Sequence, residues 1–336
     1  MLDAVYLLPL RRQHVDPADV ADLATYLARV ATALPVVVAD GSPPAVRAAH
    51  AAAWGEHVTV VPVPQPLPAT NGKVVGVLAA LAATTAERVV VADDDVRYDG
   101  GALQRVVALL DDAEVVVPQN VYSSLPWHAR WDTARSLLNR AFGGDYPGTL
   151  AVRRSALGSD GYDAGVLFEN LELIRTVLAR GGRVRRALDL YVTRRPPTVR
   201  KFAEQRVRQA YDSFAQPVRL VVELALVPLT LGALVGTRGR GRALVLGTFG
   251  CVATAVAEVG RRRAHGTAHF APTAALWAPV WLAERAVCSW AAVMWRARGG
   301  VPYAGTRLRT AAHPVRELRR RAGGTRPVAA HRPEAA

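Results

Sequence analysis

Short hydrophobic runs rich in valine recur through the first half of the chain, and each has the length of a buried β-strand. The runs cover residues 4–10, 34–40, 57–63, 88–95 and 113–119. Between them lie longer stretches rich in alanine and leucine, at 17–33, 43–53, 72–86 and 100–111, which predict α-helices. Because strand and helix alternate, the pattern predicts an α/β fold whose sheet is mostly parallel and sandwiched by helices.

Two of the predicted strands end in acidic residues. Asp40 closes the run "VVVAD", and Asp93 to Asp95 close the run "VVVADDD". Ligands of parallel sheets bind beyond the carboxyl ends of the strands, and hard divalent cations prefer carboxylate oxygens. Three adjacent carboxylates also repel one another unless a cation or solvent offsets them. On these residues alone, a cation site at Asp93 and Asp95 and a solvated turn that caps the next helix both remain open.

The order of the motifs resembles the family 2 glycosyltransferases, which have a GT-A fold. The resemblance extends over roughly residues 1–305 and rests on "ADGS", "NGK", "ADDD" and "QRVR". It implies that Asp40 contacts the base of a nucleotide-sugar donor and that Lys73 lies on the donor side. It also implies that Asp93 and Asp95 hold Mg²⁺ or Mn²⁺ on the donor diphosphate.

The acceptor side of the resemblance is less regular. The stretch "VLFENLEL" takes the place of the family's Glu-Asp motif, whose Asp is usually the general base, and Asn170 stands at that position. An amide accepts no proton at neutral pH, so Glu169 and Glu172 are the candidates for that role. Gln205 and Arg208 match the Q-x-x-R part of a Q-x-x-R-W motif, whose Trp is absent here. The resemblance implies an inverting transfer of a sugar from a UDP- or GDP-sugar.

The positive charge of the chain lies almost wholly in its last part. The formal net charge is +14, whereas residues 1–200 hold equal numbers of basic and acidic residues. Residues 198–216 have hydrophobic positions near helical spacing among basic ones, which is typical of a helix at a membrane interface and also of an ordinary amphipathic core helix. Three apolar segments follow, at 218–236, 243–260 and 270–295. The first two are close to the length of a membrane-spanning helix.

The third apolar segment carries Glu284 and Arg285 near its middle, where charges are costly in lipid, and it is rich in tryptophan. It is predicted to lie in the interface, to pair its charges inside a bundle or to form a broken or third span. We therefore divide the chain into a catalytic domain, an interface helix, a membrane region of two or three spans, and a basic interfacial segment with a disordered tail. The expected bounds are 1–197, 198–216, 217–297 and 298–336.

These expectations describe a metal-dependent enzyme of a bacterial inner membrane with a cytosolic catalytic domain and a lipid or membrane-associated glycan as acceptor. The similarity is greatest to the ceramide glucosyltransferase-like branch. A catalytically degenerate membrane scaffold is the first alternative, since Asn170 departs from the motif. A nucleotidyltransferase is the second, although no Gly-rich loop follows the first strand. The basic residues flank apolar segments, so phospholipid is favoured over nucleic acid as the anionic partner.

Overall fold

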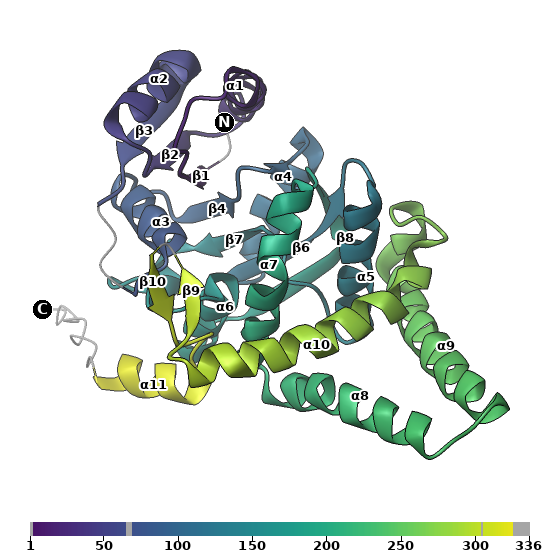
Figure 1. Cartoon of the computed structure of the whole chain (residues 1–336). Helices are drawn as coiled ribbons and strands as arrows, with labels where there is room; N and C mark the ends of the chain where they lie inside the picture. The colour runs from purple at the N-terminus through teal and green to yellow at the C-terminus, as the bar shows by residue number, and fades with distance from the viewer. Residues whose placement is uncertain (1–2, 65–68, 304, 325–336) are drawn as a thin grey trace, which may run out of the picture.

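The structure is a computed structural model that describes residues 3–64, 69–303 and 305–324. Its centre is an eight-stranded sheet with the order β3-β2-β1-β4-β7-β6-β8-β5, and a separate hairpin joins β9 and β10 (Figure 1). The strands are β1 (Val5–Leu10), β2 (Val36–Asp40), β3 (Val58–Pro62), β4 (Arg88–Ala92), β5 (Val96–Arg97), β6 (Val115–Tyr122), β7 (Thr149–Arg153), β8 (Val184–Arg194), β9 (Val301–Tyr303) and β10 (Thr306–Leu308).

Parallel pairing dominates one half of the sheet, and antiparallel pairing enters in the other. Strands β3, β2, β1 and β4 run parallel to one another, and β6 runs parallel to β8. Strand β7 runs antiparallel to both β4 and β6. The predicted α/β class with a mixed, mostly parallel sheet is therefore confirmed, and the arrangement is that of a GT-A-like fold.

Helices cover both faces of this sheet. The helices of the described residues are α1 (Pro17–Ala31), α2 (Pro44–Trp54), α3 (Gly72–Ala82), α4 (Gly100–Ala108), α5 (Trp127–Ala141), α6 (Glu169–Ala179), α7 (Val199–Tyr211), α8 (Pro217–Val235), α9 (Arg240–Arg262), α10 (Ala278–Ala297) and α11 (Val315–Gly324). Short 3₁₀ turns lie at Gly55–His57, Leu109–Asp111, Arg154–Leu157, Asp212–Ala215, Arg263–Ala268 and Ala274–Trp277.

Local sequence explains several of these boundaries. The Asp16 carboxylate accepts hydrogen bonds from the backbone N–H groups of Ala18 and Asp19, and Pro17 opens α1 where no N–H is needed. The apolar strands then pack two buried clusters, one on each face of the sheet. Alternate residues of β1 enter opposite clusters, since successive side chains of a strand point to opposite faces.

The last third of the chain has two parts with different surroundings. Helix α10 packs against α5 and α7 of the main body, and the second half of α9 packs against α5. Helix α8 and the first half of α9 project outward as a hairpin (Figure 1). By length and composition alone, α8 and α9 are apolar enough to cross a membrane, and only 6% of the apolar window of α8 is buried. Of the two charges in the third apolar segment, Glu284 pairs inside the fold: it lies 3.4 Å from Arg206 Nη1 and accepts from the Trp131 indole at 2.8 Å. Arg285 is buried, and its Nε and Nη1 have no hydrogen-bond partner among the described residues. Residues 325–336 of the expected tail lie outside the described residues, and residues 322–324 end α11.

Candidate active site

Asp93 and Asp95 lie just beyond the carboxyl end of β4, beside the start of β7. The N–H of Asp93 donates to the carbonyl of Gly148 at 2.8 Å. Because Gly148 directly precedes β7, this hydrogen bond holds the acidic turn against the start of β7. A Cβ added to Gly148 would lie 2.6 Å from Asp93 Oδ2, which is closer than side chains approach. A glycine at position 148 therefore allows the acidic turn to sit flush against β7.

Lys73 joins two of the predicted site residues. Its ammonium lies 2.6 Å from Asp93 Oδ1 and 2.7 Å from Glu169 Oε1. Lys73 is in the first turn of α3, and Glu169 opens α6, so the contact brings together segments almost a hundred residues apart. Although burial disfavours the charged form, the two carboxylates raise the pKa of Lys73. Lys73 therefore stays cationic at the centre of the cluster.

Arg194, at the end of β8, is a member of this cluster that the sequence reasoning missed. Its Nε donates to Asp95 Oδ2 at 2.9 Å, and its Nη2 lies 3.7 Å from Asp93 Oδ2. The sequence pattern predicted no strand over residues 184–194, and only the fold brings the end of β8 to the same sheet edge as the end of β4. Arg12, which follows β1, was also missed and forms an ion pair with Asp94.

The acidic pair has one oxygen left to bind a cation. Asp95 Oδ1 is buried and has no hydrogen-bond partner among the described residues. Burial raises the pKa of Asp95, with Arg194 opposing and the neighbouring Asp93 adding to the rise. For Asp93, burial also acts upward, but Lys73 and Arg194 outweigh it and its pKa is lowered. An orphaned oxygen in a pair of carboxylates fits the oxygen-ligand preference of Mg²⁺ or Mn²⁺.

Asp40 sits at the carboxyl end of β2, but its side chain is fully buried. Its Oδ1 accepts from the N–H of Ser42 at 2.8 Å, and its Oδ2 lies 2.7 Å from His50 Nδ1. The Ser42 hydroxyl in turn accepts from the N–H of Arg12 at 2.8 Å. Asp40 thus holds the turn that follows β2 and, through Ser42, the backbone after β1.

Gln205 and Arg208 lie one turn apart on α7 and are both half-buried. Arg208 places its guanidinium carbon 6.0 Å from the centroid of the Tyr303 ring. Burial raises the pKa of Tyr303, as does nearby Glu169, while Arg208 and Lys73 oppose that rise. Arg208 is therefore on the same side of the molecule as the Lys73–Glu169 pair.

Asp212 follows α7 and is a further acidic group near this side of the site. Burial raises its pKa to about 7, with Glu169 adding to the rise and Arg208 opposing it. Its Oδ1 is buried without a hydrogen-bond partner among the described residues. No motif marked it, because only the fold brings the end of α7 close to the start of α6.

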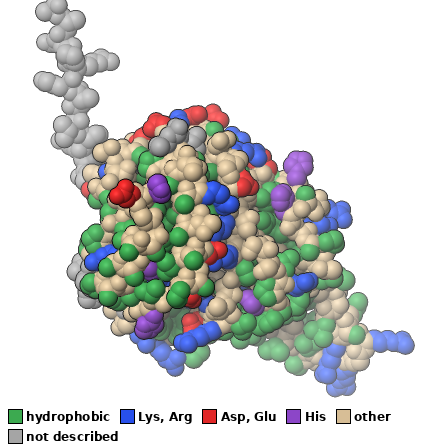
Figure 2. All heavy atoms as spheres, turned by 90° about the horizontal axis from the view of Figure 1, so that it is seen from above, with side chains coloured by type: hydrophobic (Ala, Val, Ile, Leu, Met, Phe, Trp, Pro, Cys, Tyr) green, Lys and Arg blue, Asp and Glu red, His purple; other side chains and the backbone are tan. Residues whose placement is uncertain are grey.

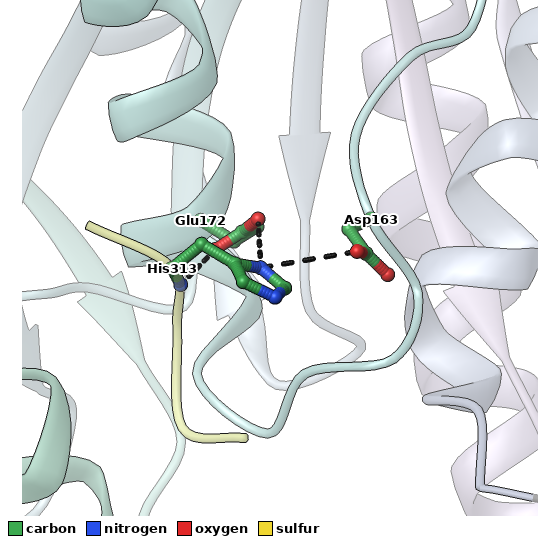
Figure 3. Close-up of side chains that lie close together, drawn as sticks. All are labelled: Asp163, Glu172 and His313. Carbon is green, nitrogen blue, oxygen red and sulfur yellow. Dashed lines mark hydrogen bonds and ion pairs between the residues drawn. The ribbon is translucent and has the colours of Figure 1, made fainter. Parts of the chain in front are cut away.

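The side chain of Glu172 lies against His313 of the C-terminal segment (Figure 3). Its oxygens accept from the N–H of His313 at 2.7 Å and lie 2.9 Å from His313 Nδ1, and the carboxylate is fully buried. Asp163 completes a group whose ligand-type atoms lie within 4.8 Å of one another. Because Arg321 donates to Asp163 at 2.8 Å, this group is an ion-pair network that fastens α11 to the body.

Comparison with known proteins identifies the central part of the chain. Residues 36–167 match the family model described as Glycosyl transferase family 2. This stretch of the chain is therefore similar to the family 2 glycosyltransferases. None of the curated proteins compared matches the chain. The predicted enzyme class, a glycosyltransferase, is confirmed at this level, whereas the ceramide glucosyltransferase-like branch stays a prediction.

Solved structures support the fold. The mannosyltransferase PcManGT from Pyrobaculum calidifontis, in complex with GDP-Man and Mn²⁺, has a TM-score of 0.53 at 17% identity, over 86% of this chain and 87% of that one. Glucosyl-3-phosphoglycerate synthase from Mycobacterium tuberculosis, with Mn²⁺ and UDP-glucose, has a TM-score of 0.43 at 18% identity, over 60% and 73%. Mannosyl-3-phosphoglycerate synthase from Rubrobacter xylanophilus has a TM-score of 0.40 at 16% identity, over 60% and 69%. The first superposition shows a shared fold, and the other two scores are too low to carry an argument.

Proposed function

We propose that this protein transfers a sugar from a nucleotide-sugar donor to a lipid or membrane-associated glycan, with inversion at the anomeric carbon and dependence on Mg²⁺ or Mn²⁺. The single observation that carries the proposal is the junction at Lys73, which brings the acidic pair of β4 and the first residue of α6 to one point. A donor-side cluster and a carboxylate on the acceptor side are what glycosyl transfer needs.

On the donor side, Asp93 and Asp95 would hold the cation, which supplies positive charge for the leaving diphosphate. Lys73 and Arg208 supply further positive charge there, and Arg194 holds the acidic pair in place. The Asp40 turn, with the backbone of Arg12 bonded to Ser42, forms the base-binding end of the donor site. The Pyrobaculum mannosyltransferase, which shares the fold and was solved in complex with GDP-Man and Mn²⁺, supports the class of donor and the cation.

On the acceptor side, Glu169 takes the proton of the attacking hydroxyl. The hydroxyl oxygen forms a bond to the anomeric carbon as the bond from that carbon to the diphosphate oxygen breaks. The electron pair of the broken bond leaves with the nucleoside diphosphate. Asn170 cannot take this proton, and its amide donates to the carbonyl of Pro147 at 2.8 Å instead. Gln205 orients the acceptor from the next helix. Glu172 is the weaker candidate for the base, because His313 already holds both of its oxygens.

A membrane-bound acceptor is supported by the α8–α9 hairpin. Large hydrophobic side chains stay exposed along both helices, among them Val222, Leu231, Leu246 and Val252. Basic residues occupy the turn between the helices at 238–242. From above, basic side chains stand at the far right-hand edge of the molecule, beyond hydrophobic ones (Figure 2). We place the body of the enzyme on the cytosolic side of a bacterial inner membrane, where nucleotide sugars are made.

The deciding experiment measures sugar-nucleotide hydrolysis and transfer by the detergent-purified full chain. UDP- and GDP-sugars are screened with Mn²⁺ or Mg²⁺ and added membrane lipid extract. We expect metal-dependent turnover, and we expect Asp95→Ala to abolish it while the thermal unfolding profile stays cooperative. Full activity in a folded Asp95→Ala protein would disprove the metal assignment.

A degenerate scaffold is the second candidate function, because Asn170 replaces the expected base and both metal-site carboxylates already pair with cationic side chains. The same preparation separates the two proposals. Folded wild-type protein that binds neither nucleotide nor Mn²⁺ in titration calorimetry would favour the scaffold. Binding of the donor without transfer would favour the enzyme with its acceptor missing from the extract.

A further inference from the structure

The chain returns to the active site after the apolar helices. Strands β9 and β10 form a hairpin beside α3 (Figure 1), and the residues that follow pair with the loop before α6. The N–H groups of Leu167 and Phe168 donate to the carbonyls of Thr310 and Ala311 at 3.0 and 2.8 Å. This C-terminal segment lies far beyond residues 36–167, which the family model covers. It nevertheless fixes the backbone that leads directly into Glu169.

The hydroxyl of Tyr303, the last residue of β9, reaches the first turn of α3. It donates to Asn71 Oδ1 at 2.9 Å, and the same oxygen accepts from the N–H of Lys73 at 3.0 Å. Asn71 is almost fully buried, and its Nδ2 donates to the carbonyl of Val166 at 3.1 Å. Tyr303 therefore holds the residue that caps α3 and sets the backbone of Lys73.

The ring of Tyr303 lies beside a second cation. The Arg208 guanidinium carbon is 6.0 Å from the ring centroid, at the outer range of a cation–π contact. Gln209, which follows Arg208, has no aromatic ring, and its side-chain oxygen accepts a hydrogen bond from Arg206. Tyr303 thus contacts Asn71, which holds the backbone of Lys73, and its ring lies beside Arg208. Lys73 and Arg208 are the two cations that we place at the leaving diphosphate.

We propose that Tyr303 is a positioning residue for glycosyl transfer, which aligns Lys73 through Asn71 and Arg208 through its ring. The inference rests on the proposed function, since it assigns both cations to the donor diphosphate. Positive charge stabilises that leaving group only when it is already in place as the bond breaks. A hairpin at the far end of the chain therefore sets the geometry of the donor site.

The test compares Tyr303→Phe, Tyr303→Leu and the matched control Tyr211→Phe in the full chain. Tyr211 also donates its hydroxyl to the C-terminal segment, at the Arg309 carbonyl, and among the described residues no hydrogen bond joins its side chain to Asn71 or Lys73. We expect kcat/KM for the donor to fall roughly threefold to tenfold in Tyr303→Phe, which loses one hydrogen bond. In Tyr303→Leu it should fall roughly tenfold to a hundredfold, because the ring is lost as well. Tyr211→Phe should stay within about twofold of wild type, even if its unfolding temperature drops.

Several outcomes would overturn the inference. Wild-type kinetics in Tyr303→Leu would show that the ring and hydroxyl position nothing. Equal losses of activity in Tyr303→Phe and Tyr211→Phe, in proportion to their losses of unfolding temperature, would reduce Tyr303 to a structural anchor. If the wild-type protein itself shows neither donor binding nor turnover, the proposed function fails and the inference fails with it. If the wild-type protein turns over the donor and the variants give either of the first two outcomes, the inference fails and the proposed function stands.

Discussion

Glu169 and Glu172 lie one turn apart on the same helix, but they contact different parts of the molecule. Glu169 shares the Lys73 ammonium with Asp93, whereas Glu172 is buried against His313. The motif pattern made both of them candidates, because spacing along a helix does not say what each side chain faces. Only packing of the C-terminal segment against α6 separates the two carboxylates.

A pair of conservative substitutions tests this separation. Glu169→Gln should lower kcat by about two to four powers of ten, as expected for loss of a general base, with little change in unfolding temperature. Glu172→Gln should instead lower the unfolding temperature, because a buried charged hydrogen bond is lost, and should leave kcat within about tenfold of wild type. Transfer assays and thermal unfolding of both variants measure this. The reverse pattern would move the base to Glu172.

At the scale of elements, α11 and the strand-like segment before it are fastened by charge. His313 bonds Glu172, and Arg321 bonds Asp163 and pairs with Glu317, so three carboxylates face two cationic side chains. The hydrogen bond to Glu172 raises the pKa of His313 above its ordinary value, although burial opposes it. This attachment therefore depends on pH.

The sign follows from the direction of that shift. His313 binds its proton more tightly in the folded chain, so the stabilisation is fully present below about pH 6.5, the ordinary pKa of histidine, and is lost as the pH rises through the raised folded value. The unfolding temperature of wild type should exceed that of His313→Gln most at pH 6, and the gap should narrow by pH 9. Thermal unfolding across this range measures the gap. A gap independent of pH would mean that the neutral imidazole holds the contact.

The strand and helix pattern was predicted well where hydrophobic runs were short and regular. The runs at 34–40 and 57–63 became β2 and β3 almost unchanged, since a buried strand needs little more than a run of apolar residues bounded by turns. The antiparallel placement of β7 between β4 and β6 was not predictable in this way. Strand direction depends on which edges pair, and no local pattern carries that information.

At the scale of the whole molecule, a folded body carries an outward apolar hairpin. Buried contacts bind α10 to the body: Trp281 is almost fully buried in the cluster that includes Leu137 of α5 and Ala257 of α9. Helix α8, by contrast, leaves most of its apolar surface uncovered. Exposed apolar area of this extent indicates an interaction surface, and two adjacent apolar helices with a basic turn suit a lipid bilayer.

Vesicle binding tests this arrangement. The full chain should co-sediment with vesicles that contain anionic lipid, and Leu229→Arg with Leu231→Arg should lower the bound fraction at least roughly tenfold, because arginine is costly in the hydrocarbon region. Both leucines are exposed on α8. Val15→Arg, at an exposed position before α1, is the matched control and should bind as wild type does. Unchanged binding of the double variant would place the lipid contact elsewhere.

Sequence alone determined the α/β class, the acidic turn after β4 and the two long apolar helices, because each depends on neighbouring residues and their periodicity. The sequence motifs also indicated four candidate site residues, Lys73, Glu169, Gln205 and Arg208. Only the tertiary structure decided that Arg194 and Tyr303 adjoin these residues, and that Asp40 turns its carboxylate inward to Ser42 and His50. These contacts join segments that are distant in sequence, and their geometry depends on packing of the whole chain, which no local pattern encodes.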